Sequence, residues 1–227
     1  MRVRIAVLIA MVAGSVAFAK ENKTAQRLDE AATVISEIMD TPDKGIPQDL
    51  LDKAQCIIVV PGLKKGAFIL GGKYGKGVVS CRKSGGTGWT APASIRIEGG
   101  SVGLQIGGSE SDVVMLVMNE RGMQKLMESK FTLGGEGEVA AGPVGRNATA
   151  QTDALMHAEI LSWSRSRGIF AGISLQGATL RQDLDDNKEL YGKAYETKDI
   201  LNGNVAVPAA ASKLISLLGK YSARKTG

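Results

Sequence analysis

Glycine is distributed through the centre of this chain in a way that restricts its fold. The 227 residues include 29 glycines, about twice the usual share of ~7%, but only six prolines. The glycines have no three-residue period, which excludes a collagen-like triple helix. Many fall in pairs between short runs rich in valine and isoleucine, and glycine in or beside strands marks bends and close backbone approach. The centre of the chain is therefore expected to form a strongly curved sheet.

Short β-branched runs bounded by glycine or proline predict the individual strands. The expected strands cover residues 56–60, 66–71, 77–82, 93–98, 102–106, 113–118, 131–133, 139–141, 154–164 and 168–175. Pro61-Gly62 is expected to end the first of them. Gly99-Gly100 lies between two alternating runs and predicts a two-residue hairpin turn.

Both ends of the chain show helical periodicity instead. Apolar residues recur at helical spacing at Leu28, Ala32, Ile35 and Met39, which predicts an amphipathic helix over 20–40. Further helices are expected from Pro47 to Lys53 and over 120–129, 182–191, 198–201 and 208–221. No linker rich in proline or serine divides the chain. The pattern predicts one α+β domain, with a strongly curved, largely antiparallel glycine-rich sheet flanked by N- and C-terminal helices.

The first nineteen residues have the parts of a secretory signal. Arg2 and Arg4 form a basic start, an apolar run follows from Ile5 to Ala13, and Ala17-Phe18-Ala19 matches a cleavage site. The apolar run is too short to span a bilayer comfortably, so cleavage is favoured over a retained anchor. Residues 20–227 are therefore expected to be exported, as a periplasmic or secreted domain.

Two cysteines, Cys56 and Cys81, lie on expected strands. In an oxidising compartment they can form a disulfide if those strands are neighbours. The alternative is that both are small buried hydrophobic residues. The sequence leaves both open, with the second preferred.

Positive charge is concentrated in one part of the chain. Lys53 to Ile97 contains eight basic residues and no acidic one, although the chain without Arg2 and Arg4 has only 26 basic against 23 acidic residues. Such segregation is typical of a surface that meets phosphate or another anion. Lysines on strand edges also discourage aggregation, which is the structural alternative.

The common catalytic and metal-binding patterns are absent from the sequence. His157 is the one histidine, no G-x-S-x-G motif occurs, and the cysteines lack C-x-x-C spacing. The glycine-rich segments 71–77 and 134–137 precede strand-like runs and not the helix that a phosphate-binding loop needs. No metal, cofactor or enzymatic activity is expected, and a reaction using His157 with Glu159 is the remaining enzymatic alternative. Few aromatic residues (4%) and the expected export argue against nucleic-acid binding.

Several glycine and proline motifs occur in a recognisable order. They are Ile46-Pro47, AQCIIVVP at 54–61, GAFILGG at 66–72, GKGV at 75–78, WTAP at 89–92, AAGPVGR at 140–146, GIFAGISL at 168–175, Asn187 with Tyr191-Gly192, and ILNG at 200–203. In this order they resemble the SYLF domain family of lipid-binding proteins, over residues 25–218. The resemblance implies a phospholipid-binding module. Some eukaryotic relatives also bundle actin, but the signal sequence points to the exported bacterial branch, so only lipid binding is carried over.

Charge and resemblance together predict a non-enzymatic domain that docks on anionic phospholipid surfaces of the cell envelope. The expected lipid contacts are Lys64, Lys65, Lys73, Lys76, Arg82 and Lys83. The alternative is a protein-interaction or assembly module that uses the same basic surface for an acidic partner or for self-association. The helix over 20–40 is expected to pack on the sheet, with insertion into the membrane interface as its alternative.

Overall fold

The computed structural model describes residues 22–41, 45–68, 70–84, 87–102, 107–134, 138–145, 157–166 and 168–222. The expected signal segment, Met1–Ala19, lies outside the described residues. Within the described ranges, no helix has both the length and the hydropathy needed to cross a membrane.

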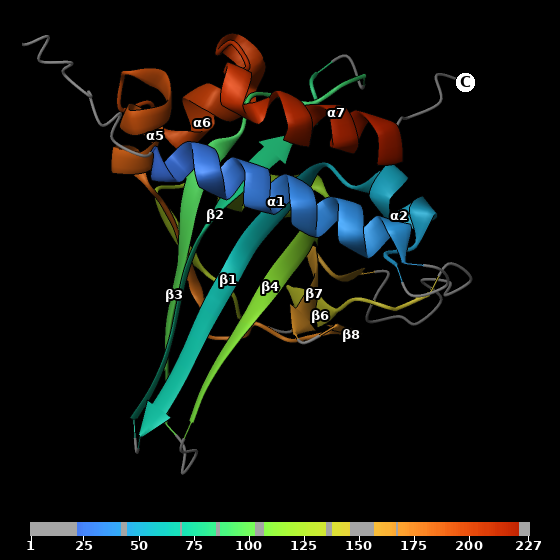
Figure 1. The fold of residues 1–227 in the computed structure, drawn as a ribbon, viewed down its shortest axis with the longest axis vertical. Coiled ribbons are helices and arrows are strands. Elements are labelled where there is room, and N and C mark those ends of the chain that lie inside the picture. Colours follow the sequence, from blue (N-terminus) through green and yellow to red (C-terminus); the bar gives the residue numbers. More distant parts are fainter. Residues whose placement is uncertain are drawn as a thin grey trace, which may run out of the picture.

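A curled sheet forms the centre of the molecule (Figure 1). Its described strands are β1 (Cys56–Phe68), β2 (Leu70–Cys81), β3 (Ala93–Val102), β4 (Gly107–Val117), β5 (Lys130–Thr132), β6 (Val139–Ala141), β7 (Ile160–Ser166), β8 (Ile169–Gly172) and β9 (Thr179–Gln182). They lie in the order β5-β9-β3-β2-β1-β4-β7-β6, with β8 also beside β7. The β6–β7 pair is parallel and the other described pairs are antiparallel. The prediction of a single α+β domain with a strongly curved sheet is confirmed.

Helices from the two ends of the chain cover one face of this sheet (Figure 1). The described helices are α1 (Lys23–Asp40), α2 (Gln48–Lys53), α3 (Glu120–Leu126), α5 (Leu184–Tyr191), α6 (Thr197–Asp199), η1 (Ile200–Asn204), η2 (Ala209–Ala211) and α7 (Ser212–Tyr221). Asn22 caps α1 by accepting a hydrogen bond from the Ala25 N–H. The apolar stripe of α1, including Leu28 and Ile35, is fully buried against the sheet and α7. The preferred expectation for this helix, packing on the sheet, is confirmed.

The sheet separates two hydrophobic clusters. Alternate residues of β1 enter different clusters: Ile57 and Val59 face α1, whereas Ile58 and Val60 pack on the opposite side. Because both faces are covered here, the strand has a continuous apolar run and no polar alternation.

Two turn signals in the sequence do not produce turns, and these expectations were wrong. Pro61-Gly62 forms a bulge within β1, where Val60 lies opposite Val113 but Leu63 lies opposite Ser111. A bulge tolerates the missing N–H of proline, and Gly62 supplies a left-handed φ of 60°. Gly99-Gly100 continues β3, because Lys73 and Gly72 of β2 pair with these two glycines.

Other strand expectations also need correction. The β1–β2 turn lies inside the expected strand 66–71, since Phe68 is already paired with Leu70. β7 begins at Ile160, six residues later than expected. The sequence patterns did not predict β9, a four-residue strand that lies between β3 and β5 and pairs with both.

Glycine requirements differ along the sheet. A Cβ on Gly77 would lie 2.3 Å from the Val59 carbonyl oxygen, so glycine is required where β2 passes the β1 bulge. A Cβ on Gly66 would meet nothing within 4 Å. Close backbone approach therefore requires glycine at position 77 and not at position 66.

The two cysteines lie directly opposite each other on β1 and β2 and form a disulfide. Both are also almost completely buried, at 0% and 1% exposure. The preferred alternative, two free buried thiols, was therefore wrong, although the expectation of burial was right. Their cross-strand register could not be read from a sequence separation of 25.

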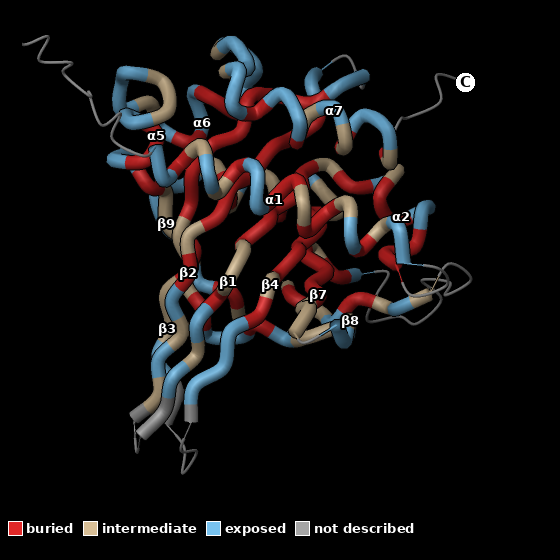
Figure 2. Tube along the Cα trace, in the orientation of Figure 1, coloured by how far each residue is buried: buried red, intermediate tan, exposed pale blue. Residues whose placement is uncertain are grey.

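Strands β1 to β4 extend well beyond the body of the molecule. On the outer sides of these strands, β9 pairs only with Ile95–Glu98 of β3, and β7 only with Asp112–Val117 of β4. The remainder projects away from the helices, and Figure 2 shows mostly exposed and intermediate residues along it. We call this projection the β-finger; it comprises residues 64–68, 70–74, 99–102 and 107–110.

Candidate functional site

Two lysines face each other on the β-finger. Lys65 of β1 and Lys73 of β2 are register partners, on the sheet face that carries Leu63 and lies opposite α1. Like charges directly opposite each other destabilise a sheet. Neither ammonium has an ion pair with a carboxylate of the described residues. The pair is therefore an unfavourable arrangement that a bound anion would relieve.

The electrostatics of Lys73 agree with this arrangement. Burial lowers the pKa of Lys73, and the positive charge of Lys65 lowers it further. The stem of Lys73 lies over Gly99, 3.1 Å from the place of a Cβ there. Glycine at that position leaves room for the lysine chain to lie along the sheet.

A third lysine occupies the other face of the β-finger. Lys64 is exposed and lies opposite Tyr74 on β2 and Glu110 on β4. Tyr74 is 49% exposed, an unusual position for a large aromatic residue. A shallow depression of about 410 Å³ beside Lys64 is lined by Lys64, Lys65, Gly66, Gly108, Ser109 and Glu110. The β-finger thus carries cationic groups on both faces.

Lys76, a predicted lipid contact, lies in a different environment. Its ammonium is 2.8 Å from an Asp183 carboxylate oxygen and 2.9 Å from one of Asp186. Asp186 also pairs with Arg27 of α1. This network joins β2, α5 and α1, so the charge of Lys76 is neutralised inside the fold.

Arg82, another predicted contact, is buried at 8% exposure. Its guanidinium donates to the carbonyl oxygens of Ala54 (3.1 Å), Leu51 (3.1 Å) and Ser222 (2.9 Å). It also lies 4.7 Å from the ring centroid of Trp89. Arg82 therefore ties the end of α2 and the residue after α7 to β2. Sequence reasoning missed this role because the acceptors are backbone carbonyls up to 140 positions away.

The remaining basic residues of the acid-free segment are dispersed. Lys83 is exposed, but it follows the end of β2 that is remote from the β-finger (Figure 1). Lys53 pairs with Asp49 at 3.9 Å, and Arg96 with Glu98 at 2.7 Å. Of the six predicted lipid contacts, the structure brings Lys64, Lys65 and Lys73 together, and it places the other three elsewhere.

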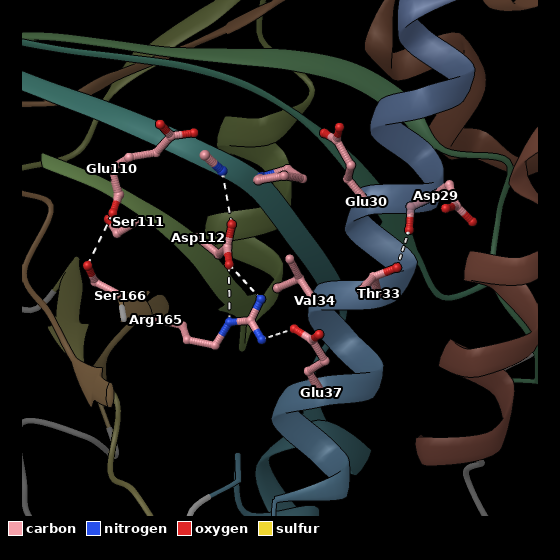
Figure 3. Close-up of a pocket in the computed structure, with 12 residues that line it drawn as sticks. Asp29, Glu30, Thr33, Val34, Glu37, Glu110, Ser111, Asp112, Arg165 and Ser166 are labelled. Carbon is pink, nitrogen blue, oxygen red and sulfur yellow. Dashed lines mark hydrogen bonds and ion pairs between the residues drawn. The ribbon is translucent and has the colours of Figure 1, made fainter. Parts of the chain in front are cut away.

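A polar groove of about 550 Å³ lies between α1 and the sheet (Figure 3). Arg165 of β7 lies at its centre, with Nη2 2.7 Å from Asp112, and it also pairs with Glu37 of α1. Burial by itself would lower the pKa of Arg165, but these two carboxylates raise it. The N–H of Gly62 donates to the second Asp112 oxygen at 3.0 Å. The two oxygens of Asp112 thus join the β1 bulge to Arg165 of β7, and Arg165 in turn links this pair to α1 through Glu37.

The carboxylate beside His157 also has a structural partner. Glu159 lies 2.9 Å from the ammonium of Lys125, which pairs with Glu138 as well. These contacts connect α3 with the segments that precede β6 and β7. In the described part of the chain, no group of three or more His, Cys, Asp or Glu residues is arranged to hold a metal ion.

Motif residues that carry the family resemblance also hold the fold together. The side chain of Asn187 accepts from the Ser94 N–H at 2.7 Å and donates to the Tyr195 carbonyl at 2.9 Å. The hydroxyl of Tyr191 donates to the carbonyl of Pro92 at 2.6 Å. These motif residues therefore have a structural role: they fasten α5 and the segment after it to the start of β3.

Comparison with known proteins identifies the same family. The family model Ysc84, described as "Las17-binding protein actin regulator", matches residues 98–221. SH3 domain-containing YSC84-like protein 1 of Xenopus laevis is 36% identical over 208 residues, covering 89% of this chain and 60% of the relative. SH3 domain-containing protein PJ696.02 of Schizosaccharomyces pombe is 38% identical over 176 residues (76% and 40%). Protein YSC84 of Saccharomyces cerevisiae is 35% identical over 179 residues (78% and 38%).

The match covers most of this chain but only part of each relative. The chain spans 38–60% of the length of these three curated relatives, so their activities as whole proteins do not transfer directly. The family model covers more than half of the chain, and the relatives exceed 30% identity over at least three quarters of it. The chain therefore belongs to the Ysc84 family, whose shared unit is the SYLF domain.

Proposed function

We propose that this domain binds anionic phospholipid surfaces through Lys64, Lys65 and Lys73 of the β-finger, without catalysing a reaction. The observation that carries this proposal is the opposed pair Lys65 and Lys73, which has no carboxylate partner in the described residues. A phosphate group between the two ammonium groups would remove their mutual repulsion. Each cation near an anionic leaflet contributes about 1 kcal/mol, so three acting together give useful binding.

The proposed contact set is smaller than the six residues expected from the sequence. Lys76 and Arg82 are engaged by protein groups, and releasing them for a headgroup would leave buried partners without donors. Lys83 is too remote from the β-finger to act with it (Figure 1). Charge reversal at all six positions would therefore combine loss of binding with loss of the fold.

The double variant Lys65→Gln with Lys73→Gln is expected to bind anionic vesicles about 30-fold more weakly, because it loses two cations worth about 1 kcal/mol each. Co-sedimentation with vesicles of phosphatidylcholine and phosphatidylglycerol in equal parts measures this. Native binding is expected to weaken with added salt and to be absent with phosphatidylcholine alone.

A matched control removes the same charge at other places. Lys53→Gln with Lys83→Gln changes two lysines outside the β-finger and is expected to bind as the native protein does. Equal losses in the two double variants would show a response to net charge alone and would contradict a site on the β-finger.

A second candidate is protein binding through the same lysines. The names of the family model and of one relative, LAS seventeen-binding protein 3 of Saccharomyces cerevisiae, describe protein-binding proteins. Lys64, Lys65 and Lys73 would then meet an acidic partner or a second copy of the chain. Self-association without lipid, abolished by the same double variant, would favour this function over lipid binding.

We also propose that the domain acts outside the cytoplasm, in the periplasm or as a secreted protein. The basis is the sequence pattern of Met1–Ala19. N-terminal sequencing of the protein recovered from the exported fraction is expected to begin at Lys20. Recovery with the first nineteen residues intact would contradict cleavage.

A further inference from the structure

Three cationic side chains lie side by side on one face of the sheet, on the strands β3, β9 and β5. Arg96 of β3 and Arg181 of β9 are register partners, and Arg181 also lies opposite Lys130 of β5. These strands are consecutive neighbours in the sheet. The arginine side chains are 35% and 38% exposed, and Lys130 is exposed as well. We call Arg96, Arg181 and Lys130 the cation row.

Strand alternation gives the cation row its orientation. On the same strands, Ile97, Leu180 and Phe131 pack in the hydrophobic cluster on the side of the sheet opposite α1, so the cation row points the other way. Like charges directly opposite each other destabilise a sheet. Lysine on an edge strand such as β5 discourages aggregation, but β3 and β9 lie inside the sheet. Edge protection therefore does not explain the two arginines.

A single carboxylate serves both arginines of the cation row. The two oxygens of Glu98 lie 2.7 Å from Nε of Arg96 and 3.0 Å from Nε of Arg181. In the described part of the chain, no ion pair or hydrogen bond engages the Nη groups of either arginine or the ammonium of Lys130. The row thus carries three positive charges against one negative charge. Glu98 also shows that the two guanidinium groups accept a carboxylate between them.

We propose that the cation row binds an extended acidic segment of a partner protein, whose carboxylates meet the free N–H groups of the two arginines and Lys130. Arginine suits this ligand, because its planar guanidinium matches the geometry of a carboxylate. Lys65 and Lys73 point to the opposite face of the sheet, so a flat bilayer that contacts that pair does not reach the cation row. The proposed partner therefore adds to lipid binding and does not depend on it.

The dimensions of the cation row fit an extended chain. Neighbouring strands lie about 4.8 Å apart, so the row spans about 10 Å from β3 to β5. In an extended peptide, the side chains of residues i and i+2 leave the same side of the backbone about 7 Å apart. Two carboxylates of an acidic segment can therefore meet the row at once.

Polar and aromatic groups flank the cation row on the same face. Thr132 of β5 and Thr179 of β9 share a hydrogen bond between their hydroxyls at 3.1 Å. Tyr74 of β2, the register partner of Glu98, is 49% exposed. Tyrosine is enriched in protein interfaces, because it combines an apolar ring with a polar hydroxyl. These neighbours favour a peptide with mixed side chains over a layer of lipid headgroups.

Fluorescence anisotropy of a labelled peptide tests this proposal. The ligand is a fluorescein-labelled peptide of alternating glutamate and serine, and a peptide of alternating glutamine and serine is the comparison. The native protein is expected to bind the acidic peptide at low salt, more weakly as salt is added, and not to bind the glutamine peptide. Arg181→Gln with Lys130→Gln should weaken binding of the acidic peptide about tenfold, because two of the three cations are removed.

A matched control removes the same charge from the β-finger. Lys65→Gln with Lys73→Gln should leave peptide binding unchanged. Equal weakening in the two double variants, or weakening in the β-finger variant alone, would overturn the cation row as the site. Arg96 still holds Glu98 in the Arg181 and Lys130 variant, so its thermal unfolding is expected to match that of the native protein.

Removing the carboxylate within the row gives a readout of opposite sign. Glu98→Gln frees both arginines from their internal partner and should tighten binding of the acidic peptide about threefold. Glu196→Gln makes the same change of charge at an exposed carboxylate that pairs with Lys198, and it should leave the affinity unchanged. Equal tightening in both variants would show a response to net charge alone and would contradict a site at the cation row.

Vesicle binding separates the cation row from the proposed lipid site. The Arg181→Gln and Lys130→Gln variant is expected to bind vesicles of phosphatidylcholine and phosphatidylglycerol as the native protein does. Loss of vesicle binding in this variant would show that the row contacts lipid and would overturn its assignment to a protein partner. Absence of peptide binding by the native protein would also overturn the assignment and leave lipid binding standing. Absence of vesicle binding by the native protein would overturn only the lipid-binding function.

Discussion

Replacing Arg82 with methionine is expected to lower the free energy of unfolding by about 3–5 kcal/mol at neutral pH, since each buried acceptor left without a donor costs about 1–3 kcal/mol. The carbonyl oxygens of Ala54 and Ser222 would lose their guanidinium donor, whereas that of Leu51 keeps the Ser222 hydroxyl as a donor. Methionine retains much of the side-chain volume beside Trp89, so the change mainly removes hydrogen bonds and the cation above the ring. Urea-induced unfolding measures the difference.

The adjacent residue supplies the control. Lys83→Met removes the same charge from an exposed position and is expected to change stability by no more than about 0.5 kcal/mol. The folded fraction of the Arg82 variant should still bind anionic vesicles as the native protein does. If the Arg82 variant were as stable as the native protein but no longer bound vesicles, Arg82 would be a lipid contact and this structural role would be wrong.

Replacing Lys76 with methionine is expected to lower the free energy of unfolding by about 3 kcal/mol at neutral pH, because it leaves a buried carboxylate without its cationic partner. The carboxylate of Asp183 is 2% exposed and loses its cationic partner, whereas Asp186 keeps Arg27. Thermal unfolding should show the loss as a lower midpoint temperature. Lys53→Met, whose side chain is 69% exposed, is the matched control and should leave the midpoint unchanged.

The loss at Lys76 should depend on pH with a defined sign. Burial by itself would raise the pKa of Asp183, but hydrogen bonds from Lys76 and the Asp186 N–H hold that pKa below its ordinary value. A depressed carboxyl pKa stabilises the native protein above the pKa of the unfolded chain, about 3.9, and this stabilisation disappears as pH falls through the lower native value. The native protein and the variant should therefore differ fully at neutral pH and converge below about pH 4. A difference that stays constant with pH would contradict this account.

Sequence patterns predicted correctly those helices and strands whose formation depends on residues close together in the chain. The stripe through Leu28 and Ile35 predicted α1, because any helix with that spacing must bury it. Pro61-Gly62 and Gly99-Gly100 misled, because a turn-compatible pair becomes a bulge or a straight strand when neighbouring strands pair through it. β9 was missed because its four residues are held by β3 and β5 more than by their own preference.

The candidate site was likewise predicted only where its residues are close together in the chain. Lys65 and Lys73 are eight positions apart on one hairpin, so the acid-free basic segment in the sequence was enough to predict that they lie close together. Lys76 and Arg82 look equivalent to them in sequence. Their partners, Asp186 and Ser222, lie 110 and 140 positions away, and only the tertiary structure separates buried cations from available ones.

The packing of the first described helix against the last has a consequence for biosynthesis. Leu28 of α1 and Leu214 of α7 belong to one hydrophobic cluster, although 185 residues separate them along the chain. At about 5–20 residues per second, a ribosome makes the second about 10–40 s after the first. The hydrogen bond from Arg82 to the Ser222 carbonyl likewise cannot form until Ser222 has been synthesised. The nascent polypeptide therefore cannot close this core before α7 has been synthesised, and until then the unpaired apolar face of α1 remains accessible to chaperones.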